Sequence, residues 1–535
     1  MRAQTAGAAR TLIGVDLGST HTKAVLVAPG SGVLHVARRA TETHTVRGGG
    51  AFHKPAELLS AVSSAIAECV AAAGAARKPV AIGIASMAES GVPIDRRNLP
   101  VGDILAWHDP RPDRQAAWLE RQIGAAALFA RTGLRPEPKY TLPKLLWLRE
   151  QRAADFTRLR RWAGVAEMVA LDMTGQLATN ASLACRTLAF NITTRSWDAE
   201  LLALASLGPD EMPTVLPLGQ AVGGLTAAAA ARLGLAGGTP VAIAGHDHLA
   251  AAVGAGVTRP GDALDSMGSA EAALIVTERP ALTDEVRRGG FSTGCHAIDG
   301  LAYVVGGLQS SGALVEWFVD TLLAGPAPAR SGATGGGAPR KGSPAAHGAS
   351  DRLELERYSR FIELLERARP GPVEPIVRPY LRGLTAPHRD PSASLEFEGL
   401  RETHTLVDLA AAVVDGASYH VRWMLDELVR ITGTRLDSVK LTGGGARNRR
   451  WVTAKAALGP GRLEVIRTDE AAALGAALVA GVAGDLYASV ADALVDVSPF
   501  DRVTAPATIR ARYDAAYLDC WLPAVISRLR QTGPS

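Results

Sequence analysis

Residues 11–30, TLIGVDLGSTHTKAVLVAPG, contain two strand-like apolar runs, Leu12–Val15 and Lys23–Val27, joined by a Gly-Ser-Thr turn. This pattern predicts a β-hairpin with small polar residues at its tip. Residues 262–276, DALDSMGSAEAALIV, repeat the same order with a turn at Gly268 and Ser269. Two copies of one hairpin pattern, far apart in the sequence, suggest a chain built from two similar halves. Chance similarity of two short segments is the alternative.

Further apolar runs alternate with helical patterns along the chain. The runs with strand character are 80–86, 241–245 and 439–448, and those with helical spacing are 56–73, 141–151, 406–428 and 469–484. Strands alternating with helices predict α/β layers. At 535 residues the chain exceeds the size of one core, so two or more domains are expected.

The composition excludes several classes of protein. A hydrophobic share of 47% with 21% charged residues is typical of a soluble globular protein. The net charge of +4 is spread without a dense basic block, so nucleic-acid binding is not expected. No window approaches about 18 uncharged apolar residues, so we expect no transmembrane helix and no membrane partner. The first ten residues have no apolar core, so we expect no signal peptide.

The four cysteines, Cys69, Cys185, Cys295 and Cys520, are scattered without C-x-x-C pairs. This spacing favours free thiols in a reducing cytoplasm over a disulfide framework. Residues 324–350 are rich in Gly, Pro and Ser and nearly free of large apolar side chains. We expect a disordered surface insertion there, because such a segment cannot offset its ordering entropy by burial.

The first hairpin tip could bind phosphate. Gly18, Ser19 and Thr20 offer backbone N–H and hydroxyl donors, and Lys23 adds a nearby positive charge. Asp16 ends the preceding run and could hold a hydrated magnesium ion, since Mg²⁺ keeps most of its waters and uses few carboxylates. An ordinary hairpin is the alternative.

A glycine run, Gly443–Gly445 in LTGGGARNRRW, lies between a predicted strand and a helix. Glycine lets the backbone approach a ligand closely, and the unpaired N–H groups of a helix start favour phosphate. A sharp strand-to-helix turn is the alternative. The run is no Walker A loop, since the Gly-Lys-Ser/Thr ending is missing.

A Pro-rich loop at 107–112, WHDPRP, brings together Trp107, Asp109 and Arg111. An aromatic face with polar donors and acceptors suits a polyhydroxylated ligand. A solvated Asp109–Arg111 ion pair is the alternative.

The stretch IAGHDHLAAAVGAG, residues 243–256, carries His246, Asp247 and His248 directly after an apolar run. On a strand the two histidines would share a face and Asp247 would point away, which does not complete a zinc shell. As a carboxylate at the carboxyl end of a strand, Asp247 could instead accept a hydroxyl proton during attack on phosphorus. A helix N-cap is the third interpretation.

The chain resembles the FGGY carbohydrate kinases, a branch of the actin-like, ribonuclease-H-like ATPase superfamily, from Thr11 to Gly484. Eight elements occur in the family's order: VDLGSTHTKA, IASMAESGVPID, WHDPR, KLLWLREQ, GHDHLAAAVGAG, SMGSAEA, LTGGGARN and DEAAALGAA. The resemblance implies an α/β fold of two ribonuclease-H-like (actin-like ATPase) domains with a cleft between them.

The same resemblance implies how the chain is divided. A sugar-binding domain would occupy 11–258 and a nucleotide-binding domain 259–490, interrupted by the insertion at 324–350. Residues 1–10 would be a flexible tail, and residues 491–535 a C-terminal extension.

Site residues also follow from the resemblance. Asp247 looks like the family's catalytic base and a substrate contact, and Glu89 lies where the family places another substrate contact. The other matching positions are Asp16, Gly18, Ser19, Thr20 and Lys23 in the first phosphate motif, Gly268 and Ser269 in the second, Gly443, Gly444, Gly445 and Asn448 in the adenosine motif, and Trp107, Asp109 and Arg111 in the sugar motif W-x-D-x-R.

Departures from the family bear on the substrate. Glycerol kinases carry an Arg-Glu pair where this chain has Ala88 and Glu89, so the missing guanidinium argues against glycerol. Xylulose kinases carry Met-His at these two positions. Lys139 stands where a small or aromatic residue is usual, and Leu395 replaces a usual small residue.

We therefore expect a cytoplasmic enzyme that uses ATP and Mg²⁺ to phosphorylate a hydroxyl on a sugar or polyol, whether ketose, sugar alcohol or sugar acid. Dimers are common in the family, which makes a homodimer a candidate assembly. Two alternatives stay open: a non-catalytic nucleotide-binding module of the same superfamily, and a metal-dependent hydrolase that uses the His-Asp-His cluster.

Overall fold

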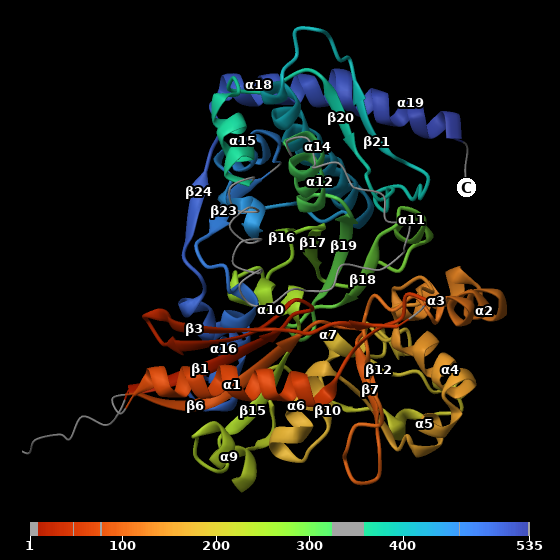
Figure 1. Ribbon diagram of the computed structural model, residues 1–535, viewed down its shortest axis with the longest axis vertical. Coiled ribbons are helices and arrows are strands. Elements are labelled where there is room, and N and C mark those ends of the chain that lie inside the picture. Colours follow the sequence, from red (N-terminus) through yellow and green to blue (C-terminus); the bar gives the residue numbers. More distant parts are fainter. Residues whose placement is uncertain (1–8, 47, 75–76, 324–357, 460, 533–535) are drawn as a thin grey trace, which may run out of the picture.

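A computed structural model describes residues 9–46, 48–74, 77–323, 358–459 and 461–532. Figure 1 shows two stacked lobes, with the first strands and helices in the lower lobe and most later elements in the upper one. The predicted insertion at 324–350 lies outside the described residues.

The first half of the chain forms a six-stranded sheet in the order β14-β15-β6-β1-β2-β3. Its strands are β1 (Ala9–Leu17), β2 (His21–Ala28), β3 (Gly32–Ala40), β6 (Arg77–Ser86), β14 (Ala221–Gly224) and β15 (Pro240–His246). β1 and β2 pair antiparallel and form the predicted hairpin. β6 runs parallel to both β1 and β15, so these three strands end at the same edge.

The second half forms a seven-stranded sheet in the order β18-β19-β17-β16-β22-β23-β24. Its strands are β16 (Asp262–Met267), β17 (Glu271–Thr277), β18 (Ser292–Cys295), β19 (Ala302–Leu308), β22 (Ser438–Thr442), β23 (Arg462–Ile466) and β24 (Phe500–Val503). The order β19-β17-β16-β22-β23 repeats β3-β2-β1-β6-β15, with the same parallel and antiparallel pairings. The prediction of two similar α/β halves is confirmed.

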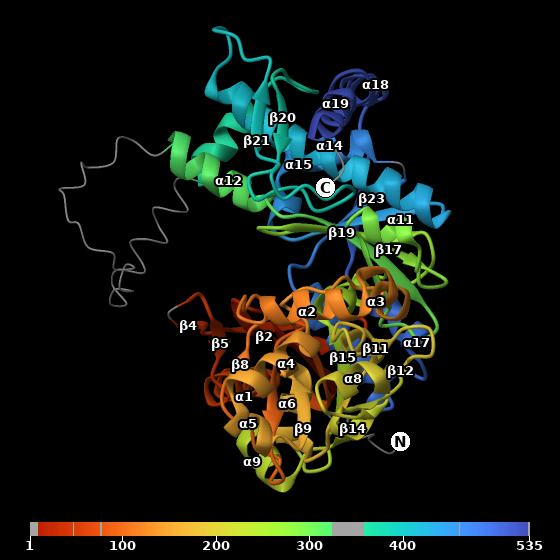
Figure 2. The same cartoon turned by 90° about the vertical axis from the view of Figure 1, so that its right-hand side faces the viewer.

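Each sheet has its own covering helices (Figure 2). In the lower lobe they include α1 (Pro55–Ala73), α6 (Val165–Thr174) and α9 (Ala227–Leu233), and in the upper lobe α12 (Gly312–Phe318), α14 (Leu406–Thr432), α15 (Arg449–Leu458), α18 (Ala507–Ala515) and α19 (Leu522–Thr532). α14 begins at a capping box of Thr405 and Asp408 and ends at Gly433 in the left-handed region.

Two helices, α10 (Asp247–Gly254) and α16 (Ala471–Ala483), lie at the junction of the lobes (Figure 1). α16 packs against β1 and β6 of the first sheet and against α10. Leu249 and Val253 of α10 share one buried cluster with Leu264 and Leu274 of the second sheet. Apolar burial therefore joins the halves through the helix that begins with Asp247.

Glycines make the contacts of α16 unusually close. A Cβ added to Gly14 of β1 would lie 1.8 Å from the carbonyl oxygen of Ala473, and one added to Gly83 of β6 would lie 1.8 Å from that of Ala476. Only glycine allows backbone to pack against backbone in this way.

The remaining elements are short or peripheral. They are the five-stranded sheet of β4 (His44–Thr45), β5 (Ala51–His53), β8 (Ile104–Leu105), β7 (Gly91–Ile94) and β9 (Arg161–Gly164), the pairs β10 (Ala178–Thr179) with β13 (Thr214–Val215), β11 (Phe190–Asn191) with β12 (Ser196–Trp197) and β20 (Ile376–Pro379) with β21 (Leu395–Glu398), and the helices α2 (Asp113–Ile123), α3 (Ala125–Thr132), α4 (Thr141–Gln151), α5 (Ala153–Arg158), α7 (Ala181–Ala184), α8 (Ala199–Leu204), α11 (Asp284–Arg288) and α17 (Val490–Ala493).

Some predicted boundaries are wrong. β1 begins at Ala9, inside the expected tail at 1–10. The strand expected at 439–448 ends at Thr442, because Gly443 adopts a φ of 90° and a 3-10 turn, Gly444–Arg447, follows. The segment 491–535 contributes β24, which pairs with β23 of the second sheet.

One segment of the chain does meet the length and composition of a membrane-spanning helix, contrary to the expectation that no window does. α1 is long and apolar enough to cross a membrane by length and composition alone. In the fold it lies against β2 and β3, and side chains such as Leu58, Val62 and Ile66 are buried there. It therefore forms part of the core of the first lobe.

Candidate active site

The first hairpin and α10 bring two carboxylates together. Asp16 lies near the end of β1, opposite Lys23 of β2 in the hairpin register. Asp247 opens α10 directly after β15, and β15 and β1 end at the same edge because both run parallel to β6. Ligands of open α/β sheets bind at this edge.

Asp16 is an unusual carboxyl group. Burial, then the charge of Asp247, raises the pKa of Asp16 to about 7, against the opposing charge of Lys23. Its Oδ1 is buried and has no hydrogen-bond partner among the described residues. A cation next to Asp16 would satisfy this oxygen and relieve the repulsion between the two carboxylates.

Asp247 remains ionised. His246 Nε2 lies 3.1 Å from Asp247 Oδ1, and the backbone N–H of His248 donates to the same oxygen at 2.7 Å. Burial raises the pKa of Asp247. The charges of His246 and His248 and their hydrogen bonds to the carboxylate outweigh this effect and lower the pKa to about 2. The carboxylate is thus available to accept a proton at neutral pH.

The expected geometry of the His-Asp-His cluster is wrong. One ligand atom from each of His246, Asp247 and His248 lies within 4.8 Å of the others, whereas a strand would have turned Asp247 away. The strand ends at His246 and the helix begins at Asp247, so the three side chains converge. His246, rather than Asp247, occupies the N-cap position of α10, without a side-chain capping bond.

Glu470 joins this site and was missed in the sequence. It lies immediately before α16, is buried, and binds Lys23 Nζ at 2.8 Å and Arg38 Nη2 at 2.6 Å. Lys23 is therefore half of an ion pair and offers less free charge than the sequence suggested. An acidic residue before an apolar helix resembles an ordinary cap, so nothing local marks Glu470.

The second hairpin tip lies beside the glycine run. A Cβ added to Gly443 would lie 2.7 Å from the carbonyl oxygen of Met267, the residue before Gly268. The start of α12 closes on the same tip, since the N–H of Gly312 donates to the carbonyl oxygen of Gly268 at 3.0 Å. Ser269 Oγ lies 3.4 Å from Glu316 Oε1. The structure thus brings Gly268, Ser269 and Gly443–Gly445 together in the second half.

Asn448 has a structural partner. Its Oδ1 accepts a hydrogen bond from the N–H of Trp451 at 3.0 Å and caps α15. Next to it, Arg447 pairs with Asp469, the neighbour of Glu470. This ion pair connects the glycine run to the residue that binds Lys23.

Glu89 lies in an ion pair that the sequence did not predict. Arg186, two residues after α7, donates to Glu89 Oε1 from Nη2 at 2.6 Å and from Nε at 2.8 Å. The argument against glycerol from a missing guanidinium is therefore wrong, because another segment supplies one beside Glu89. Arg186 belongs to no recognised motif, and its partner lies 97 residues away in the chain.

The WHDPR loop is only partly open to solvent. Asp109 is buried and binds Arg111 through Nε at 2.9 Å and Nη2 at 2.6 Å, while the Arg111 guanidinium stacks 4.4 Å from the Trp147 ring centroid. The pair exists, as the alternative interpretation held, but it is packed into the protein and not solvated. Trp107 is 40% exposed and could contact a ligand.

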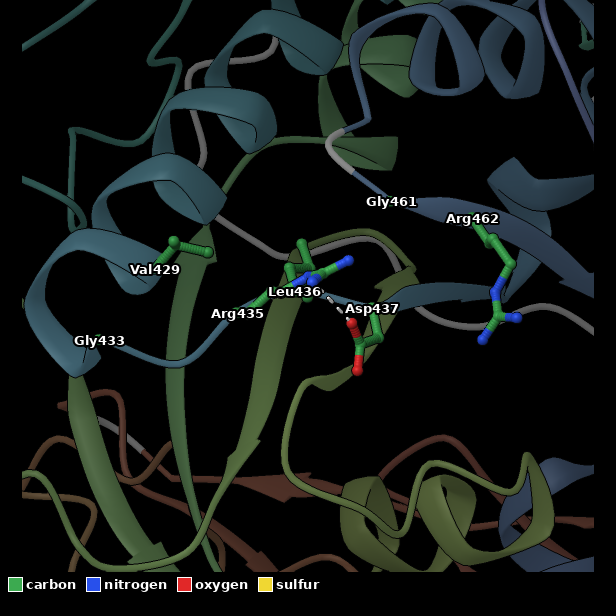
Figure 3. A pocket seen from close by; sticks show the side chains of 7 residues that line it. All are labelled: Val429, Gly433, Arg435, Leu436, Asp437, Gly461 and Arg462. Carbon is green, nitrogen blue, oxygen red and sulfur yellow. Dashed lines mark ion pairs between the residues drawn. The ribbon is translucent and has the colours of Figure 1, made fainter.

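Two grooves are lined by residues other than the candidate site residues. A groove of about 660 Å³ runs between the halves and is lined by Glu120 and Arg135 of the first and Arg287, Arg389 and Glu427 of the second. Another groove, of about 1000 Å³, lies beside Asp437, at the opposite end of β22 from the glycine run (Figure 3). The second groove is therefore separate from the candidate site.

Comparisons with known proteins agree with this arrangement. The N-terminal domain model of the FGGY family of carbohydrate kinases matches residues 11–254, and its C-terminal domain model matches residues 263–484. A gluconokinase from Bacillus licheniformis is 24% identical over 469 residues, covering 88% of this chain and 86% of the relative. A glycerol kinase from Trichlorobacter lovleyi is 28% identical over 485 residues, covering 88% of this chain and 90% of the relative.

A solved structure shows the same fold. The crystal structure of a xyloylose kinase from Brucella ovis superposes with a TM-score of 0.83 at 25% identity, covering 98% of this chain and all of that one. Family relatives of this kind do not support the non-catalytic alternative. The chain, an ATP-dependent kinase of sugars or polyols, belongs to the FGGY family of carbohydrate kinases.

Proposed function

We propose that Asp247 accepts the proton of a sugar hydroxyl while that oxygen attacks the γ-phosphorus of ATP. The observation that carries the proposal is the position of Asp247, an ionised carboxylate at the sheet edge beside Asp16. A pKa of about 2 makes Asp247 a weak base. That suffices for phosphoryl transfer, because the loose transition state requires orientation of the hydroxyl more than early proton removal.

Asp16 would hold Mg²⁺. Its buried Oδ1 without a partner and its closeness to a second carboxylate fit a hydrated cation. When bound, the ion neutralises charge on the phosphoryl oxygens of ATP. Asp16 would hold the ion through its waters, next to Asp247.

The hairpin tips and the glycine run would bind the nucleotide. The backbone N–H groups of Ser19 and Ser269 donate to no acceptor within the described residues, so each can bind a phosphate oxygen. Gly443–Gly445 allow the adenosine to approach the backbone. Because Glu470 neutralises part of the charge of Lys23, we assign phosphate binding mainly to the backbone donors.

Substitution of Asp247 tests this assignment. Asp247→Ala should lower turnover by about 10²-fold or more, whereas the Kd of ATP should stay nearly unchanged. ATP consumption with magnesium is measured across ketoses, polyols and sugar acids, with a control lacking sugar. Near-normal turnover in Asp247→Ala would remove Asp247 as the base.

We infer a cytoplasmic enzyme from the cysteines, since Cys69, Cys185 and Cys295 are free and buried. A homodimer remains a prediction, which light scattering of the purified protein would test.

A further inference from the structure

Three buried charged side chains, here called the Lys455 cluster, lie beneath the second hairpin tip. Lys455 of α15 places its Nζ 2.7 Å from Asp265 Oδ2 and 2.6 Å from Glu271 Oε1. Asp265 belongs to β16 and Glu271 opens β17, so the lysine bridges the two strands just below Gly268 and Ser269. None of the three side chains is more than 4% exposed.

The charges of the Lys455 cluster cancel. Burial, then the charge of Glu271, raises the pKa of Asp265 well above its usual value, against the opposing charge of Lys455. Burial raises the pKa of Glu271, but Lys455, then a hydrogen bond with Asp265, lower it below its usual value. Asp265 is therefore a carboxylic acid that donates to Glu271, while Glu271 is a carboxylate and Lys455 an ammonium. Removal of the ammonium would leave the Glu271 carboxylate buried without a counterion.

The Lys455 cluster is joined to the start of α12. The hydroxyl of Ser311, the residue before α12, donates to Glu271 Oε2 at 2.5 Å, and Ser311 is itself buried. The next two backbone N–H groups donate to the carbonyl oxygens of Gly268 and Ser269, at 3.0 and 2.9 Å. The cluster therefore holds the start of α12 and the hairpin tip against each other.

These contacts fix the direction of the backbone donors at the tip. In a trans peptide the N–H points opposite to the carbonyl of the preceding residue. Because α12 binds the carbonyl oxygens of Gly268 and Ser269, the N–H groups of Ser269 and Ala270 point away from α12. Backbone N–H groups held in a fixed direction bind anions such as phosphate, since they need no reorganisation when the anion arrives.

The first hairpin supports its tip without such charges. By the registers of the two hairpins, the positions equivalent to Asp265 and Glu271 hold Val15 and Thr22. Val15 belongs to the apolar cluster of the first sheet. Uncharged side chains thus suffice to hold a hairpin of this kind, and a buried ion pair is often no more stabilising than apolar side chains of similar volume. The charges in the second half therefore point to a role in placing the tip rather than in stability.

We propose that Lys455 is a positioning residue for ATP, which holds the second hairpin tip so that the N–H groups of Ser269 and Ala270 meet phosphate oxygens. The proposal rests on the proposed function, in which this tip binds phosphate. Lys455 does not contact the nucleotide but acts on the tip through Glu271 and Ser311. It belongs to no motif found in the sequence, and its partner Asp265 lies 190 residues away in the chain.

The test compares the binding of ATP with that of adenosine, which lacks the phosphates. The Kd of each is measured by calorimetry on the full-length chain with magnesium, for wild type and Lys455→Met. Lys440→Met is the matched control, because Lys440 is another buried lysine of the second half, with its Nζ 2.7 Å from the carbonyl oxygen of Ala255 and 3.6 Å from Glu464 Oε2. Melting curves establish that each variant folds.

Lys455→Met should raise the Kd of ATP about 10- to 100-fold and leave that of adenosine within about twofold, because a misplaced tip weakens only the contacts to phosphate. In the turnover assay the KM of ATP should rise likewise, while the KM of the sugar stays within about twofold. Lys440→Met should leave both Kd values within about twofold, since its contacts do not reach the tip.

Two milder substitutions follow the same chain of contacts. Glu271→Gln should bind ATP nearly as wild type, because an amide oxygen still accepts from Ser311 and Asp265 can ionise beside Lys455, whereas Glu271→Ala should bind it as weakly as Lys455→Met. Ser311→Ala removes one hydroxyl and should raise the Kd of ATP about 3- to 10-fold. It decides the question if Lys455→Met does not fold, and an unchanged Kd of ATP would then overturn the proposal.

Two further results would overturn the proposal. An unchanged Kd of ATP in folded Lys455→Met would remove Lys455 as a positioning residue, and equal increases in the Kd of ATP and of adenosine would make its role merely structural. In both cases the proposed function would stand, provided Asp247→Ala abolishes sugar-dependent turnover. If no sugar raised ATP turnover but Lys455→Met weakened the binding of ATP alone, the assignment of Asp247 would fail and the positioning role of Lys455 would hold.

Discussion

Replacement of Gly475 should disturb both the packing of α16 against α10 and catalysis. Gly475 of α16 faces α10, and a Cβ there would lie 1.9 Å from the carbonyl oxygen of Ala250. Since real Cβ contacts under 3.0 Å are essentially never seen, Gly475→Ala must part the two helices by about 1 Å. Overpacking of this kind lowers the free energy of unfolding by about 1–3 kcal/mol. The higher helix propensity of alanine offsets up to about 1 kcal/mol of this loss.

The same shift should impair turnover, because α10 begins with Asp247 and α16 follows Glu470. A misplacement of about 1 Å can cost about 10²-fold in rate. The variant should therefore melt at a lower temperature and show a kcat reduced by about 10- to 100-fold. Gly237→Ala is the matched control, since a Cβ at Gly237 meets nothing within 4 Å. Unchanged kcat in a folded Gly475→Ala would refute the idea that this contact positions Asp247.

Two further substitutions test single features of the fold. Burial lowers the pKa of Lys144 to about 7, against the opposing charges of Glu89 and Asp109. The unfolded chain therefore binds the Lys144 proton more tightly than the folded protein does. The free energy of unfolding of wild type should rise by up to about 1.4 kcal/mol per pH unit between about pH 7 and 9.5. Lys144→Met should lack that gain, and parallel melting curves across this range would contradict the argument. Asn448→Ala should cost about 1 kcal/mol by uncapping α15 and raise the KM of ATP, whereas Asn448→Asp should keep the cap; equal melting temperatures of all three proteins would show that the cap is dispensable.

The parts of the site that are continuous in sequence were predictable. Both hairpins carry their pattern within about 20 residues, and the glycine run follows its strand directly. The similarity of the two sheets then follows from the repeat, because two copies of one hairpin pattern imply two similar halves.

Residues that act through distant partners were not predictable. Glu470 binds Arg38 across 432 positions, and Arg186 binds Glu89 across 97, with no local signal at either end. The His-Asp-His error has a local cause. Gly245 adopts a φ of 117° at a register shift within β15, and the strand ends one residue later, at His246, so a period of two no longer applies.

The repeat itself explains why the two halves differ in chemistry. In the first hairpin Asp16 lies opposite Lys23, whereas the equivalent positions of the second hold Ser266 opposite Ala272. The two tips can share the same backbone donors, but only the first has ionisable side chains beneath its tip at this position. The proposed cation and proton acceptor would therefore lie in the first half, where the sugar hydroxyl would react. The second hairpin has no carboxylate at the position equivalent to Asp16, so its backbone donors could bind phosphate oxygens without competing for the metal ion there.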